Sequence, residues 1–142
     1  MTAETAAPGR DTTREETRAM KTCLVVDDSR VVRRVVRRIL ENLDFEVTEA
    51  GDGVVALAAC ERSMPDAILL DWNMPLLNGP DFLRELRRRP HGGDPKVIFC
   101  TTQSELEDIV EAISIGANEY IMKPFDSEVI EDKLREVGLI AA

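Results

Sequence analysis

Histidine, aromatic residues and long apolar runs are all scarce in this chain of 142 residues. It has one histidine, and aromatic residues make up 4% of the sequence. No apolar stretch approaches the roughly 20 residues of a membrane-spanning helix, and the N-terminus lacks the basic-then-apolar pattern of a secretion signal. We therefore expect a cytoplasmic protein that does not insert into a membrane.

Cysteines are few, and basic residues are outnumbered by acidic ones. The three cysteines, Cys23, Cys60 and Cys100, are widely spaced in apolar surroundings, which argues against a disulfide framework or a metal knuckle. We expect them to be small buried hydrophobic residues. With 18 Lys+Arg against 27 Asp+Glu, the formal net charge of −9 excludes a general affinity for nucleic acid phosphates, so DNA is not an expected partner.

The composition is that of one soluble domain, with 44% hydrophobic and 32% charged residues. Residues 1–19 form a polar run without a sustained apolar period, which predicts a disordered N-terminal extension. The domain itself is expected over residues 20–142. Met20 directly precedes the first apolar run, so the sequence leaves open whether Met1 or Met20 is the start.

Short apolar runs alternate with segments of helical periodicity. The runs predict five strands, and the segments between and after them predict five helices, of which the fourth carries the apolar residues Leu106, Ile109, Val110 and Ile113. Five such units in succession predict an α/β fold with a doubly wound parallel sheet and helices on both faces. The predicted strands are 23–27, 45–49, 67–71, 96–100 and 119–122.

The first predicted helix carries an unusual number of arginines. Its apolar stripe includes Val32, Val35 and Val36, and the arginines lie largely off that stripe, so we expect them to face solvent. A second group of arginines closes the third helix. These two groups are Arg30, Arg33, Arg34, Arg37 and Arg38, and Arg87, Arg88 and Arg89.

Acidic residues, hydroxyls and one lysine follow the predicted strands. Asp27 and Asp28 come after the first strand, Asp71 after the third, Thr101 and Thr102 after the fourth, and Lys123 after the fifth. The carboxyl ends of parallel strands share one edge, where such sheets bind ligands. Carboxylates brought together there repel unless a cation neutralises them, and oxygen ligands of this kind suit Mg²⁺. Together with a lysine and a hydroxyl, they predict an aspartate that handles phosphate.

Four segments in register carry a resemblance to a known family. VVDDS, LLDWNMP, CTT and NEYIMKPF, in this order and with these separations, resemble the receiver domain of two-component response regulators, in particular the stand-alone, CheY-like chemotaxis regulators. The similarity extends over about residues 21–137. It implies a flavodoxin-like fold with five parallel strands in the order 2-1-3-4-5 and five helices.

The resemblance also implies a phosphorylation site. Asp71 would accept a phosphoryl group from a histidine kinase. Mg²⁺ would be bound by Asp28, Asp71 and the backbone carbonyl of Asn73, with Asp27 acting mainly through bound water. Trp72 follows the phosphoacceptor in a loop, so we expect a half-exposed indole beside the metal.

Three further residues would respond to phosphorylation. Lys123 would pair with the phosphoryl oxygens, and its peptide bond to Pro124 is expected to be cis. Thr101, rather than Thr102, would be the switch hydroxyl, and the Tyr120 ring would follow its movement. Such a protein assists its own phosphorylation and dephosphorylation but is not otherwise an enzyme.

The expected output is phosphorylation-dependent protein binding by a monomer. A flagellar motor switch protein would be the partner in chemotaxis, a phosphatase is a further candidate partner, and a phosphate sink or a phosphorelay shuttle is the alternative with the same chemistry. Two rivals stay open. The arginine groups are candidates for binding a cyclic dinucleotide, and a hydrolase of the haloacid-dehalogenase type would also use aspartate, Mg²⁺ and lysine.

Overall fold

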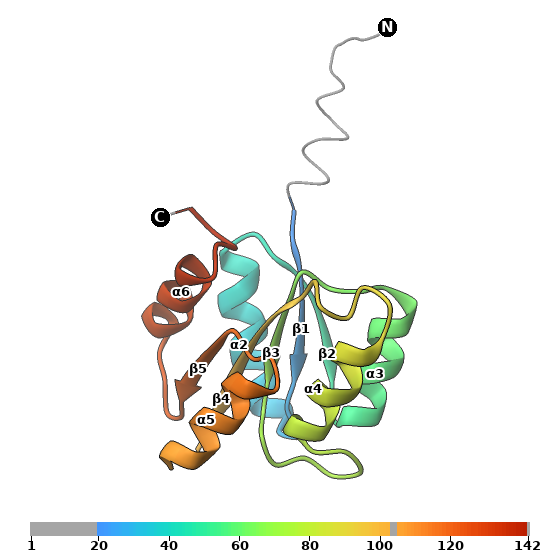
Figure 1. Ribbon diagram of the computed structural model, residues 1–142. Helices are drawn as coiled ribbons and strands as arrows, with labels where there is room; N and C mark the ends of the chain where they lie inside the picture. The colour runs from blue at the N-terminus through green and yellow to red at the C-terminus, as the bar shows by residue number, and fades with distance from the viewer. Residues whose placement is uncertain (1–19, 103–104, 142) are drawn as a thin grey trace, which may run out of the picture.

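A five-stranded parallel sheet forms the centre of the protein, in the order β2-β1-β3-β4-β5 (Figure 1). The computed structural model describes residues 20–102 and 105–141, so the predicted extension over 1–19 lies outside the described residues. The predicted doubly wound α/β fold and its strand order are confirmed. The strands are β1 (Thr22–Val26), β2 (Glu46–Ala50), β3 (Ala67–Leu70), β4 (Lys96–Thr101) and β5 (Glu119–Met122).

Helices cover both faces of the sheet. On one face, α2 (Arg30–Asn42) and α6 (Ser127–Glu136) pack through an apolar cluster that includes Leu40 and Ile130. On the other face, α3 (Gly53–Arg62), α4 (Gly79–Arg88) and α5 (Leu106–Ser114) pack through a second cluster that includes Phe82 and Ala112. None of the helices in the described part of the chain is long and apolar enough to span a membrane.

The central strands are apolar over most of their length because both of their faces are covered. All four residues of β3 are buried, as are the last four of β1. The three cysteines are buried and free, as predicted. Burial raises the pKa of the Cys60 thiol to about 11 and that of Cys100 to about 12.

Four of the five helices begin at a side chain that accepts a backbone N–H. Ser29, Asp52, Asn78 and Asp126 cap α2, α3, α4 and α6 in this way, which satisfies donors that a helix start leaves open. The fifth, α5, starts after Glu105 without such a hydrogen bond, and Ala112 is its only buried residue. Within the described residues, α5 is therefore the helix with the weakest anchoring.

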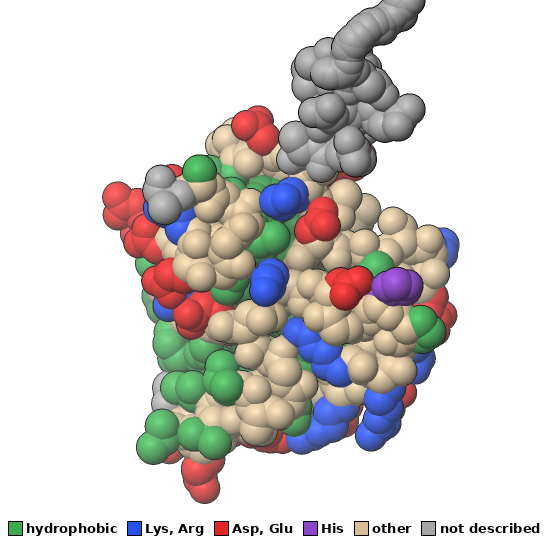
Figure 2. Space-filling model, turned by 45° about the horizontal axis from the view of Figure 1, so that its top comes forward, with side chains coloured by type: hydrophobic (Ala, Val, Ile, Leu, Met, Phe, Trp, Pro, Cys, Tyr) green, Lys and Arg blue, Asp and Glu red, His purple; other side chains and the backbone are tan. Residues whose placement is uncertain are grey.

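The apolar stripes predicted on α2 and α5 are wider than the faces that the sheet buries. On α2, Val36 is buried but Val35 is 54% exposed. On α5, the exposed fractions are 74% for Leu106, 57% for Val110 and 49% for Ile113, so the helix predicted from these residues is present but they do not pack on the core. Figure 2 shows apolar side chains gathered over α5, and Met122 of β5 adds to the exposed apolar residues of this side.

The arginines of α2 do not all face solvent, which corrects the prediction. The Arg33 side chain is only 17% exposed and pairs with Glu49 of β2, Nε to Oε1, at 3.0 Å. Arg37 approaches the other oxygen of Glu49 at 2.7 Å and donates through Nη2 to the carbonyl of Val47. Because Glu49 belongs to a different element, a helical pattern alone does not reveal this network.

In the second arginine group, Arg87 is a structural residue. Its Nη1 donates to the carbonyls of Gly92 and Pro95, and its Nη2 donates to the carbonyl of Gly116 at 2.6 Å. A side chain at Gly116, whose φ is +111°, would collide with the Arg87 guanidinium. Arg87 therefore joins the loops before β4 and β5, at the end of the sheet opposite the predicted site.

Candidate functional site: an acidic cluster at the carboxyl edge of the sheet

Three aspartates meet where β1 and β3 end. Val26 lies opposite Leu70 in the parallel pairing of these strands, so the residues that follow each strand emerge side by side. One carboxylate oxygen each from Asp27, Asp28 and Asp71 lies within 4.8 Å of the other two. Asp27 is buried, Asp71 is half-buried and Asp28 is exposed. The structure thus brings together the acids that the sequence placed at this edge.

Lys123 links two of these acids. Its Nζ lies 2.7 Å from Oδ2 of Asp27 and 3.5 Å from Oδ1 of Asp71. The lysine follows β5 and is fixed by its backbone N–H, which donates to the carbonyl of Thr101 at 2.9 Å; its bond to Pro124 is cis, as predicted. Burial alone would lower the pKa of Lys123, but the hydrogen bond that its ammonium group donates to Asp27 and the charge of Asp71 outweigh burial and raise that pKa. The lysine is therefore a fixed cation.

Backbone N–H groups hold two of the carboxylates. The N–H of Ser29 donates to Oδ1 of Asp27, and the N–H of Trp72 donates to Oδ1 of Asp71, both at 2.8 Å. The carboxylate of Asp28 makes no hydrogen bond to the rest of the described chain. Sequence reasoning missed both backbone donors, because a main-chain N–H carries no residue-specific signal.

The site is short of positive charge. Burial raises the pKa of Asp71, repulsion by Asp27 adds to this, and Lys123 opposes it. Three carboxylates face one ammonium group, so a divalent cation is the partner that the donor set favours. Hard oxygen donors, open to water on the side of Asp28, suit Mg²⁺. The residues present therefore fit the predicted metal.

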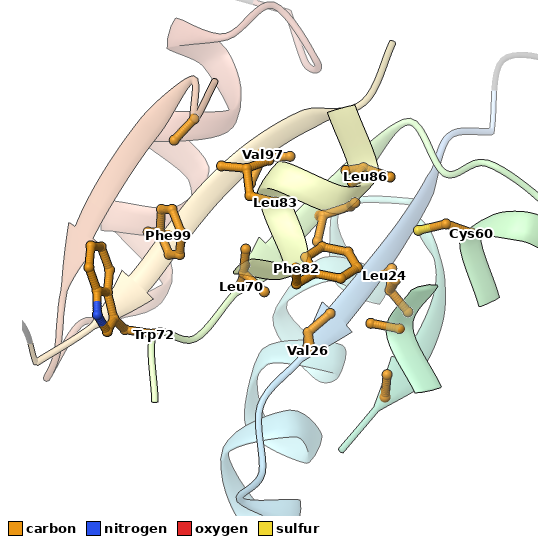
Figure 3. Packing of buried hydrophobic residues seen from close by; sticks show 14 of the residues in the cluster. Leu24, Val26, Cys60, Leu70, Trp72, Phe82, Leu83, Leu86, Val97 and Phe99 are labelled. Atoms are coloured by element: carbon orange, nitrogen blue, oxygen red, sulfur yellow. The ribbon is translucent and has the colours of Figure 1, made fainter. Parts of the chain in front are cut away.

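Trp72 is buried, which corrects the expected half-exposed indole. Its exposed fraction is 8%, and its ring packs on Phe99 of β4 with ring centroids 5.0 Å apart (Figure 3). The chain turns directly after Asp71, and this turn directs the indole back against the sheet. The indole thus lies in the core, while the backbone of the same residue holds the Asp71 carboxylate.

Thr101 and Tyr120 lie behind the acids rather than among them. Thr101 is buried at the end of β4, the strand next to β3. The Tyr120 ring packs on Phe99 at a centroid distance of 6.3 Å, so Trp72, Phe99 and Tyr120 form a row of rings from the site toward β5. Burial, with a contribution from Asp108, raises the pKa of Tyr120 to about 12. Asn73, the predicted carbonyl ligand, is exposed directly after Trp72.

An apolar groove of about 340 Å³ lies beside Lys123. It is formed by the outer face of α2 and the loop after β5, with Val31 72% exposed at its rim. Three arginines of the same helix, Arg30, Arg34 and Arg38, have no acidic partner within the described part of the chain. The groove residues are Val31, Val32, Val35, Val36, Thr102, Lys123, Pro124 and Phe125.

This fold and this acidic site define a class of signalling domain. The family model of the response regulator receiver domain matches residues 23–135, and the chain belongs to this family. Receiver domains are components of two-component signalling, so this is the functional class of the protein. The predicted membership of the CheY-like receiver domains is confirmed.

Individual relatives include chemotaxis proteins and receiver domains of known structure. The chain is 36% identical over 115 residues to the chemotaxis protein CheY-3 of Vibrio cholerae, covering 80% of this chain and 88% of that protein. The solved structure of V. cholerae CheY4 matches with a TM-score of 0.79 and 32% identity, covering 83% of this chain and 98% of the other. The receiver domain of the Pseudomonas aeruginosa sensor histidine kinase PA1611 has magnesium coordinated in its active site cleft; it matches at TM-score 0.76 and 31% identity, over 82% and 96% of the two chains.

Proposed function

We propose that the protein is a single-domain response regulator in which Asp71 accepts a phosphoryl group from a histidine kinase, with Mg²⁺ as cofactor. One observation carries this proposal: Lys123 spans Asp27 and Asp71 within a three-carboxylate cluster at the carboxyl edge of the sheet. Asp28, Asp71 and the carbonyl of Asn73 would bind the metal, and Asp27 would hold its water.

The contacts at Asp71 suggest which oxygen reacts. Oδ1 accepts the Trp72 N–H and faces Lys123, which leaves Oδ2 as the nucleophile. In the transfer, the P–N bond of the phosphohistidine breaks as an O–P bond forms on Oδ2, giving an acyl phosphate. Lys123 then pairs with a phosphoryl oxygen, and bound Mg²⁺ supplies charge neutralisation for the transferred group.

The output would pass through the row of rings. A phosphoryl group on Asp71 gives the hydroxyl of Thr101 a new acceptor, and its movement would change the space beside Tyr120. Tyr120 belongs to β5, next to the weakly anchored α5. The exposed apolar stripe of Leu106, Val110 and Ile113 supports protein binding as the output, since such patches mark interaction surfaces.

The relatives named as chemotaxis proteins support chemotaxis as the pathway. In that pathway, a flagellar motor switch protein would be the output partner and the cytoplasm the location. A phosphatase that shortens the signal fits the same site. The groove beside Lys123 is the surface that a phosphodonor approaching Asp71 would cover. A phosphate sink or shuttle would need the groove but not the apolar stripe of α5, which is why the motor output is favoured.

A cyclic dinucleotide finds less support. Two of the five arginines of α2 are already engaged by Glu49, and Arg87 is engaged by backbone carbonyls. A hydrolase of the haloacid-dehalogenase type is also disfavoured, because that class places its nucleophile after the first strand, where this chain has adjacent Asp27 and Asp28.

The test is phosphoryl uptake from a small-molecule phosphodonor, followed by intact-mass spectrometry with and without Mg²⁺. Wild-type protein should gain one phosphoryl group only with Mg²⁺, and Asp71→Asn should gain none while staying folded. Asp94→Asn, which removes an exposed carboxylate at the opposite end of the sheet, is the matched control and should behave as wild type. Uptake by Asp71→Asn, or none by the wild type, would refute the proposal.

A further inference from the structure

Arg33 connects the metal site to the neighbouring strand. From the first turn of α2 its side chain reaches back, and Nη1 donates to the backbone carbonyl of Asp27 at 2.6 Å. Its Nε lies 3.0 Å from Oε1 of Glu49 on β2. With only 17% of the side chain exposed, this guanidinium is held in place. Arg37 fixes the other oxygen of Glu49, so the anchor of Arg33 is itself held.

The contact fixes one particular peptide unit. The N–H of Asp27 donates to the carbonyl of Ala50 at 3.1 Å, and the carbonyl of Asp27 accepts from Arg33, so this residue is held on both sides. The carbonyl of Asp27 and the N–H of Asp28 belong to the same planar peptide. The orientation of that plane sets the direction in which the Asp28 side chain leaves the backbone.

Asp28 depends on this plane more than the other acids do. Asp27 is held by Ser29 and Lys123, and Asp71 by Trp72 and Lys123. No described group holds the exposed carboxylate of Asp28. We propose that Arg33 is a positioning residue for the magnesium site: by bridging Glu49 and the Asp27 carbonyl, it directs the Asp28 carboxylate toward Asp27 and Asp71. This inference rests on the proposed function.

Positioning and simple charge make opposite predictions. As a cation near three carboxylates, Arg33 repels Mg²⁺, so its removal acting through charge alone would tighten binding by about twofold or less. Loss of an outer residue that orients a metal ligand weakens metal binding by about tenfold or more. The sign of the change therefore separates the two explanations.

The experiment titrates the full-length protein with MgCl₂, using calorimetry and Trp72 fluorescence. Arg33→Gln and Arg33→Lys should each raise the dissociation constant by about tenfold. Arg33→Lys keeps the charge but loses the planar guanidinium that reaches both partners at once. Arg34→Gln is the matched control, since Arg34 is exposed and unpaired within the described chain, and it should leave the constant unchanged or slightly lower.

Two further readouts address the position of Asp28 itself. In metal-free protein, the amide resonances of Asp28 and Ser29 should shift in Arg33→Lys but not in Arg34→Lys. Phosphoryl uptake should need more Mg²⁺ in Arg33→Lys yet reach the wild-type rate at saturating Mg²⁺. If the Arg33 variants fold poorly, Glu49→Asp, which shortens the anchor and keeps its charge, should give a weaker effect of the same sign.

Some outcomes would refute the role of Arg33, and a different outcome would refute the proposed function. Magnesium binding in Arg33→Lys as tight as in the wild type, with unchanged Asp28 and Ser29 resonances, would show that Arg33 does not position Asp28. Tighter binding in Arg33→Gln, matching Arg34→Gln, would show that only its charge acts. A wild-type protein that binds no Mg²⁺ would instead refute the proposed function.

Discussion

The two edges of the sheet hold their helices by different means. At the β2 edge, α2 is capped by the side chain of Ser29 and buries Val36 and Leu40. Ion pairs of Arg33 and Arg37 with Glu49 join this helix to the strand. At the β5 edge, α5 has no side-chain cap and buries only Ala112. The first edge supports the backbone that carries the proposed metal ligands, and the second carries the proposed output surface. Firm anchoring thus coincides with the acidic cluster, and weak anchoring coincides with the surface that we propose to move.

The largest expected effect comes from removing packing at the β2 edge. Leu40 is fully buried, so Leu40→Ala should lower the free energy of unfolding by about 2–5 kcal/mol. Leu106→Ala is the matched change at the β5 edge. Because Leu106 is 74% exposed, its loss should alter the free energy by about 0.5 kcal/mol or less. Urea denaturation measures both, and equal losses would break the comparison.

An intermediate effect is expected from the ion pairs of Glu49. The hydrogen bond from Arg37 lowers the pKa of Glu49, and burial opposes this only in part. A carboxyl whose folded pKa is depressed stabilises the fold above its unfolded pKa of about 4.3, and this contribution is lost as the pH falls through the folded pKa. At pH 7, Glu49→Gln should cost about 1 kcal/mol after allowance for solvent screening.

Unfolding measured over a range of pH tests this. The difference between wild type and Glu49→Gln should disappear at acidic pH, below the folded pKa of Glu49. Glu46→Gln changes an exposed residue of the same strand that has no ion pair in the described part of the chain, and at pH 7 it should leave the free energy of unfolding close to that of the wild type. A constant difference at all pH values would contradict a charge-based anchor.

The smallest expected effect is a change in the local opening of α5 when Asp71 is phosphorylated. If this edge moves, beryllofluoride with Mg²⁺ should change hydrogen exchange of α5 amides a few-fold, which corresponds to about 1 kcal/mol or less in local opening. The amides of α2 around Val36 and Leu40 should not change. Asp71→Asn should abolish the response at α5, and an equal change in both helices would mean that the two edges are coupled.

The sequence predicted the strands and the acidic cluster correctly, because each of these depends on residue type along a single strand. Continuous apolar runs predicted the strands because both of their faces are covered, and strand ends located Asp27, Asp28, Asp71 and Lys123 because parallel strands end together. The predicted roles of these residues in phosphorylation stay predictions.

Other features depend on contacts between distant elements. Arg33 and Arg34 are adjacent in sequence, yet only Arg33 meets Glu49, and the partner lies 16 residues away on β2. Val110 repeats the apolar period of a buried helix face, but α5 lies where the sheet ends and leaves this position uncovered. Trp72 is buried because of a turn whose direction local residue preferences do not set.

The buried thiols make both edges accessible to site-specific labelling. Cys23, Cys60 and Cys100 are the only cysteines in the sequence, and burial keeps their thiols shielded and protonated at neutral pH. A cysteine introduced at an exposed position would therefore react with a maleimide dye ahead of the native three, and none of them needs to be replaced. One fluorophore on α2 and another on α5 would report the distance between the edges in the otherwise native molecule.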